Sequence, residues 1–171
     1  MLEPGKKQTL QVVRKTDFGV YLAASPDAPK EDRVLLPARQ VPEGTETGDS
    51  LTVFLYRDSE DRLIATVREP ALELGGLAVL KVREVGKIGA FLDWGLEKDL
   101  FLPFREQTVH VKKEDEVLVS LYTDKSGRLC ATMKVYHIAI QAYLKKQEKS
   151  QINNLTLHLK QLEGRNEEPQ G

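Results

Sequence analysis

The sequence has very little cysteine, and this scarcity limits its chemistry. A single residue, Cys130, allows neither a disulfide framework within the chain nor a cysteine-rich metal site. The three histidines, His110, His137 and His158, are far apart and lack the spacing of metal ligands. An unpaired cysteine fits a reducing compartment, so we expect a cytoplasmic protein without a metal or a cofactor.

Long apolar runs and a surplus of one charge are also missing. No stretch approaches the ~18 uninterrupted apolar residues of a membrane span, and residues 1–8 lack the apolar centre of a signal peptide. The 25 basic and 26 acidic residues leave a net charge of −1. Any nucleic-acid contact must therefore come from a local cationic patch.

Sequence motifs of common enzymes are absent as well. The chain has no GxxxxGK phosphate loop, no GxGxxG dinucleotide fingerprint and no GxSxG nucleophile elbow. Cys130 stands between Leu129 and Ala131 in an expected strand, which favours a core position over a nucleophile. We therefore predict that the protein is not an enzyme and has no catalytic residues.

What the chain does contain is an internal repeat. Val53–Thr66 and Val119–Thr132 agree at eight of fourteen positions without a gap, where unrelated segments would agree at about one. The offset of 66 becomes 70 further upstream, where Phe18–Leu22 faces Ile88–Leu92. The four-residue difference falls in the polar segment 24–33, as expected for an insertion in a surface loop.

Each repeat unit has the pattern of β structure. Apolar residues alternate over short runs such as Leu51–Tyr56 and Val117–Tyr122, which is typical of half-buried strands. About five such strands per unit suit a small closed barrel, which leaves no exposed sheet edge. The equivalent Gly19 and Gly89 lie within strands, where we expect a bulge or a barrel corner.

These patterns predict the division of the chain. We place one barrel at residues 1–70 and the other at 73–136, with a shared interface or a rigid linker at Glu69–Gly76. Residues 137–164 predict a helical tail because glycine and proline are absent until Gly164, and 165–171 predict a disordered terminus. Four apolar residues at heptad spacing leave open whether the helix packs on the second barrel or dimerises: Ile152, Leu155, Leu159 and Leu162.

Candidate binding residues gather around the two equivalent glycines. Single-stranded nucleic acid is bound by aromatic rings that stack on bases and by cations that follow phosphates. Both kinds occur here: Arg14, Lys15, Phe18 and Tyr21 in the first unit, and Lys87, Phe91 and Trp94 in the second. If their neighbours face the core, alternation exposes Tyr21 and Phe91, whereas the opposite orientation buries them. Trp94 could instead close one mouth of the barrel.

Two arginines follow prolines at equivalent positions of the repeats. Arg39 and Arg105 are candidates for contacts with phosphates. Each could equally pair with a nearby carboxylate, such as that of Glu43 or Glu106.

The second unit resembles a known family. Its Gly89–Leu92 segment, followed by Gly95 and Leu100–Pro103, is similar to the S1-type RNA-binding domain. More narrowly, the tandem arrangement over Gly5–Tyr136, with the segment GAFLDWGLEKDLFLPFREQ and the exit ATMKVY, resembles the conserved virulence factor B family of bacterial RNA-binding regulators. The resemblance implies an all-β fold of two tandem five-stranded S1-like OB barrels, and the residue pattern adds the C-terminal α-helical tail.

The match to the family's RNA face is uneven. In S1-type domains two aromatics around the glycine and a downstream histidine commonly form that face. Phe18 and Tyr21 match both aromatics, whereas Ile88 replaces the first one in the second unit, and the histidine positions hold Leu36 and Leu102. The family usually continues with a further S1-type domain and a winged-helix domain, so the chain is expected to be a short or truncated member.

The resemblance and the candidate residues together predict the function. We expect a cytoplasmic protein that binds single-stranded RNA and acts as a bacterial post-transcriptional or translational regulator, with the ribosome or other proteins as further partners. The alternative is a protein-interaction module that uses the barrels and the helical tail as an assembly surface. Salt distinguishes the two, because phosphate binding weakens steeply with salt and an apolar interface does not.

Overall fold

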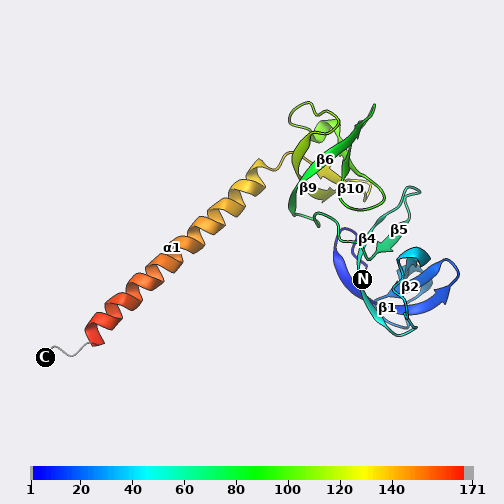
Figure 1. Ribbon diagram of the computed structural model, residues 1–171, viewed down its shortest axis with the longest axis horizontal. Helices are drawn as coiled ribbons and strands as arrows, with labels where there is room; N and C mark the ends of the chain where they lie inside the picture. Colours follow the sequence, from blue (N-terminus) through cyan, green and yellow to red (C-terminus); the bar gives the residue numbers. More distant parts are fainter. Residues whose placement is uncertain (1, 168–171) are drawn as a thin grey trace. The chain divides into compact units, whose positions relative to one another are not determined.

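The chain folds into two β units that are followed by one long helix (Figure 1). The computed structural model describes residues 2–167. The β units together form one compact body, residues 1–134, and the helix belongs to a second. The chain is thus mostly β and ends in a helix, as the sequence predicts.

The first unit is a closed barrel. Its strands follow the order β1-β2-β3-β5-β4, with β4 pairing back onto β1. The closing contact between β3 and β5 is parallel and joins Leu35 to Ile64. The strands are β1 (Lys7–Thr16), β2 (Gly19–Ala23), β3 (Val34–Pro37), β4 (Ser50–Arg57) and β5 (Leu63–Thr66), with two short 3-10 helices, η1 (Lys30–Asp32) and η2 (Ala38–Gln40).

The second unit repeats this plan but its ladder does not close. Its sheet order is β10-β9-β6-β7-β8, and β8 lies alongside β10 without a ladder of hydrogen bonds between them. The prediction of two closed barrels is therefore correct for the first unit and only approached by the second. The strands are β6 (Leu77–Val85), β7 (Gly89–Asp93), β8 (Leu100–Pro103), β9 (Glu116–Thr123) and β10 (Leu129–Thr132), with one 3-10 helix, η3 (Phe104–Glu106).

Equivalent strands of the two units are separated by the same offsets as the repeated segments of the sequence. β1 and β2 precede β6 and β7 by 70 residues, and the three later strands precede their counterparts by 66. The additional residues of the first unit lie between β2 and β3, where they include η1. The predicted insertion thus lengthens a connection that is shorter in the second unit.

The equivalent glycines do not mark the bulges of the barrels, which was one of the two roles that we predicted for them. The register shift lies in β1 between Val12 and Arg14, and at the matching place in β6, not at the glycines. A Cβ at Gly19 would stand 2.0 Å from the carbonyl oxygen of Leu36, and one at Gly89 would stand 2.5 Å from that of Leu102. Glycine is required because the neighbouring backbone passes too close for any side chain.

The hydrophobic core crosses from one barrel to the other. Val53 and Leu55 of β4 face the first core, whereas Phe54 and Tyr56 point the other way and join the core cluster of the second barrel. The connecting segment is tied to both sides, because the Leu74 amide donates to the Gly5 carbonyl and the Gly75 amide donates to that of Leu121. Burial of large aromatic side chains explains why residues 1–134 form one body.

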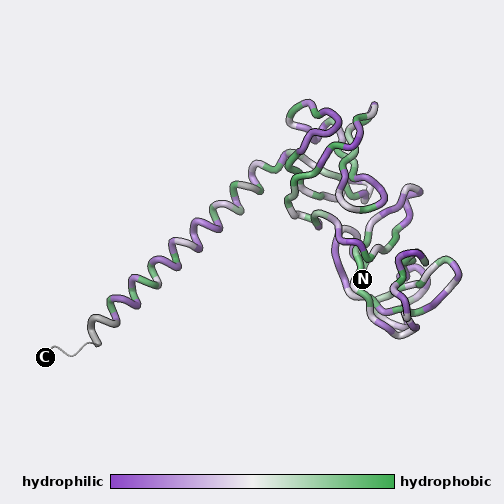
Figure 2. Tube along the Cα trace, viewed as in Figure 1, coloured by the Kyte–Doolittle hydropathy of each residue, from purple (hydrophilic) through white to green (hydrophobic). Residues whose placement is uncertain are grey.

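The tail is a single helix, α1, at Tyr136–Glu167. It continues past Gly164 to Glu167, whereas the sequence pattern predicts a disordered terminus from residue 165. The remainder of that prediction, residues 168–171, lies outside the described part of the chain. All side chains from Gln141 to Glu163 are exposed, and apolar and polar residues alternate along the helix (Figure 2). No helix of the described residues is long and apolar enough to cross a membrane.

Candidate nucleic-acid interface

The first barrel presents aromatic rings on its outer surface. Val20 and Leu22 of β2 are buried, so Tyr21 between them lies half-buried on the outer face, as alternation predicts. Phe18 is 79% exposed in the β1–β2 turn. The Thr16 hydroxyl stabilises this turn by donating to the Gly19 carbonyl and accepting from the Phe18 amide. Both rings are therefore held where a planar base could stack.

Cations surround these rings. Arg14 is exposed and stands opposite Tyr21 in the β1–β2 ladder. Lys15 is directed elsewhere, since its Nζ donates to the Thr45 carbonyl at 2.8 Å and lies 3.9 Å from the Glu46 carboxylate. Arg14 is thus better placed than Lys15 to meet a ligand on Tyr21.

The second barrel has a pair of aromatic rings on its outer face, where the first barrel has the Tyr21 ring beside the Arg14 cation. Phe91 lies half-buried between Ala90 and Leu92, which are both in the core. Its ring is 5.5 Å from that of Phe101 on β8 between centroids. Lys87 is exposed in the β6–β7 turn, but Ile88, 66% exposed, occupies the place that Phe18 has in the first barrel.

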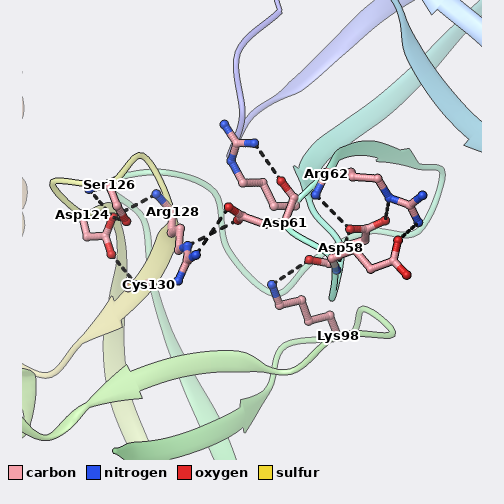
Figure 3. A network of polar contacts seen from close by, with 10 residues as sticks. Asp58, Asp61, Arg62, Lys98, Asp124, Ser126, Arg128 and Cys130 are labelled. Atoms are coloured by element: carbon pink, nitrogen blue, oxygen red, sulfur yellow. Dashed lines mark hydrogen bonds and ion pairs between the residues drawn. The ribbon is translucent and has the colours of Figure 1, made fainter.

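This aromatic pair lines an open cleft of ≈ 410 Å³ against the β4–β5 hairpin of the first barrel. The cations there already have partners. Arg128 pairs with Asp61 at 3.4 Å, and Lys98 donates to the Asp58 carbonyl at 3.0 Å (Figure 3). Surface pairs of this kind contribute little to stability. A phosphate would have to compete with them for the Arg128 guanidinium and the Lys98 ammonium group.

The prediction that Trp94 belongs to the binding face is not supported by its position. It is 3% exposed, and its ring meets Phe54 and Tyr56 of the first barrel edge-on, with centroids 5.7 and 6.3 Å away. Its indole N–H donates to the Lys98 carbonyl at 2.6 Å. Both ring faces are covered because the barrels pack on each other here, so Trp94 cannot stack on a base in this arrangement.

The two arginines after the prolines have different surroundings. Arg39 forms an ion pair with Glu97 of the second barrel, and not with the Glu43 that we considered. Arg105 is exposed beside Tyr122, whose buried hydroxyl has no hydrogen-bond partner among the described residues. Arg39 therefore contributes to the contact between the barrels, and Arg105 remains a candidate for phosphate binding.

Sequence reasoning missed two cations near Tyr21. Lys30 and Arg33 line a hollow of ≈ 300 Å³ together with Arg14 and Tyr21. The only sequence signal was the insertion at residues 24–33, which revealed an extra loop but not where the loop would fold.

Burial rather than catalysis explains the perturbed groups that lie near these faces. Burial raises the pKa of the Cys130 thiol to about 11, helped by the nearby Asp124 carboxylate, so the thiol stays protonated at neutral pH. Burial likewise raises the pKa of Tyr56, which packs against Trp94. No group of three or more potential metal ligands occurs in the described residues.

Two tandem five-stranded β units with this strand order define the structural class of small OB-type barrels. The S1 domain family model matches residues 4–68 and 74–134, so the chain belongs to the S1 domain family. Membership in this family supports nucleic-acid binding.

Two relatives extend the comparison. The uncharacterized protein YitL of Bacillus subtilis (strain 168) is 32% identical over 137 residues, which cover 76% of this chain and 44% of that protein. The crystal structure of a multidomain protein with nucleic acid binding domains from Streptococcus pneumoniae shares the fold, with a TM-score of 0.61 and 21% identity over 75% of this chain and 45% of that one. The chain thus spans less than half the length of each.

Proposed function

We propose that this chain binds single-stranded RNA without catalysing a reaction, as a cytoplasmic post-transcriptional or translational regulator of the conserved virulence factor B type. The observation that carries the proposal is the outer face of the first barrel, where Phe18 and Tyr21 lie beside Arg14. Aromatic faces bind bases of any sequence, and cations neutralise the backbone. Phe91 of the second barrel offers a further ring to the same strand, and the ribosome or other proteins are further partners.

The test is fluorescence anisotropy of a short labelled single-stranded RNA titrated with the whole chain at two salt concentrations. Tyr21→Leu removes the ring and keeps an apolar residue, and we expect it to weaken binding by about 5- to 150-fold, the value of one stacked base. Phe104→Leu is the matched control, since Phe104 is 47% exposed and lines neither the cleft beside Phe91 nor the hollow beside Tyr21. Absence of binding by the wild type at low salt would refute the proposal. A DNA strand of the same sequence tests the preference for RNA.

A second candidate function is protein assembly through the helix. Its exposed side chains include large apolar residues that no described contact covers: Tyr143, Leu144, Ile152, Leu155, Leu157, Leu159 and Leu162. If assembly is the function, removal of residues 136–171 abolishes self-association in sedimentation experiments, and the RNA titration shows no salt-dependent binding.

A further inference from the structure

The hollow beside Tyr21 collects positive charge from two separate parts of the chain. Arg14 reaches it from β1, and Lys30 and Arg33 reach it from the loop between β2 and β3. Among the residues that the structure describes, no carboxylate oxygen lies within 4.0 Å of the side-chain nitrogens of these three cations. Three guanidinium or ammonium groups around one ring, without neutralising partners, form a site for an anion rather than a network of internal ion pairs.

The loop separates its own charges. Asp27 and Asp32 line a different hollow, together with Leu2 and Pro29, while Lys30 and Arg33 face Tyr21. Arg33 also fixes the loop, because its Nε donates to the Ala28 carbonyl at 3.0 Å. Asp27 and Asp32 therefore do not compete with an anion for the cations, and the remaining carboxylate of the loop, Glu31, does not line the hollow beside Tyr21.

The second barrel reverses the charge at the same places. The residue opposite the ring of β7 is Glu84, where the first barrel has Arg14 opposite the ring of β2. Asp99 directly precedes β8, whereas Arg33 directly precedes the equivalent strand β3. Asp99 forms an ion pair with Arg83 at 3.1 Å. The shorter β7–β8 connection contains no counterpart of Lys30.

We infer that Arg14, Lys30 and Arg33 form a phosphate-binding pocket of the first barrel and that the second barrel lacks one. This inference rests on the proposed RNA binding and specifies its geometry. A phosphodiester of the strand sits among the three cations while an adjacent base stacks on Tyr21. At this face the strand's backbone is bound by the pocket of the first barrel, and the equivalent face of the second barrel offers apolar contacts through Phe91 and Phe101.

The test compares two double variants with the same change in charge. Arg14→Glu with Lys30→Glu removes two cations of the pocket at exposed positions and retains Arg33, which holds the loop. Lys112→Glu with Lys113→Glu makes the same change on the exposed loop before β9. Binding of the labelled RNA is measured over a series of salt concentrations, and thermal unfolding verifies that both variants are folded.

The pocket variant is expected to bind about tenfold more weakly at low salt, with a plot of log K against log [salt] that is shallower by about 0.7 for each phosphate that the protein no longer neutralises. The control variant should retain the wild-type slope. Equal weakening in both variants would show an effect of net charge and overturn the inference, as would an unchanged slope in the pocket variant. Those outcomes leave the proposed function intact if wild-type RNA binding is present, whereas absence of wild-type binding refutes the proposed function itself.

Discussion

Replacement of Trp94 by alanine should destabilise both barrels together. Trp94 is the only tryptophan of the chain and lies buried between the barrels, edge-on to Phe54 and Tyr56. Phe54 and Tyr56 come from β4 of the first barrel, but they belong to the core cluster of the second. Truncation at position 94 therefore leaves a cavity that both barrels line.

The magnitude follows from the size of the buried ring and its aromatic neighbours. A buried tryptophan truncated to alanine costs ~3–5 kcal/mol, within which each aromatic pair accounts for ~0.5–1.5 kcal/mol. A single domain is stable by ~5–15 kcal/mol, so this cost is a large share of the total. Trp94→Phe keeps a ring against Phe54 but removes the hydrogen bond to the Lys98 carbonyl. We expect the loss of this bond to lower the free energy of unfolding by ~0.5–1.5 kcal/mol, which is less than the cost of Trp94→Ala.

The assay is equilibrium unfolding in urea of residues 1–134, the compact body without the helix, followed by far-ultraviolet circular dichroism. In the wild type, tryptophan fluorescence reports on the contact between the barrels and should change at the same urea concentration as the dichroism, because a shared core unfolds as one unit. Phe104→Ala, at an exposed site, should stay within about 0.5 kcal/mol of the wild type. Two separate wild-type transitions, or a cost below about 1 kcal/mol for Trp94→Ala, would refute the shared core.

Three further predictions concern single residues. Gly19→Ala should lower the free energy of unfolding in urea by at least ~1–3 kcal/mol, because its Cβ would meet the Leu36 carbonyl oxygen at 2.0 Å, whereas Gly86→Ala, with its nearest contact at 3.6 Å, should cost much less. Cys130 should react slowly with a thiol reagent at pH 8 and rapidly in urea, because burial raises its pKa to about 11; fast labelling of the native protein would contradict this. Burial alone would raise the pKa of Asp58, but hydrogen bonds from the Arg62 and Glu60 amides and the Arg62 side chain outweigh it and lower the pKa. The stabilisation by Asp58 is therefore present above its unfolded pKa near 4 and is lost as the pH falls through its lower folded pKa, so Asp58→Asn should lower the urea midpoint at pH 7 and have little effect at pH 2.

The repeat in the sequence predicted the strands well because each strand depends on local alternation. The eight shared positions also include Asp58 and Asp124, and both carboxylates accept backbone amides of the hairpin that follows them. A side chain that organises its own turn acts over four residues, so its role repeats wherever the local sequence repeats. The same locality explains why the insertion at residues 24–33 could be placed from the offsets alone.

The contact between the barrels could not be predicted in this way. Both faces of β4 carry apolar residues, namely Val53, Phe54, Leu55 and Tyr56. This pattern indicates that both faces are buried but does not identify the residues that pack against them. Those residues include Trp94, nearly forty residues further along the chain. Trp94 therefore resembled a binding residue in the sequence, although the packing of the barrels makes it a core residue.

The sequence by itself determined the number of β units and the order of their strands along the chain, because alternation and repetition act through neighbouring residues. It left two orientations open for Tyr21 and Phe91, and the burial of their neighbours in the structure decided between them. Only the tertiary structure decided which cations are available to a ligand. The closed barrel brings Lys30 and Arg33 close to Arg14, although they are more than a dozen residues away in the sequence. The packing of the two hairpins places Arg128 beside Asp61, with which it forms an ion pair. Charges interact through space rather than along the chain, so the sign of the net charge on each candidate face depends on which segments the fold brings together.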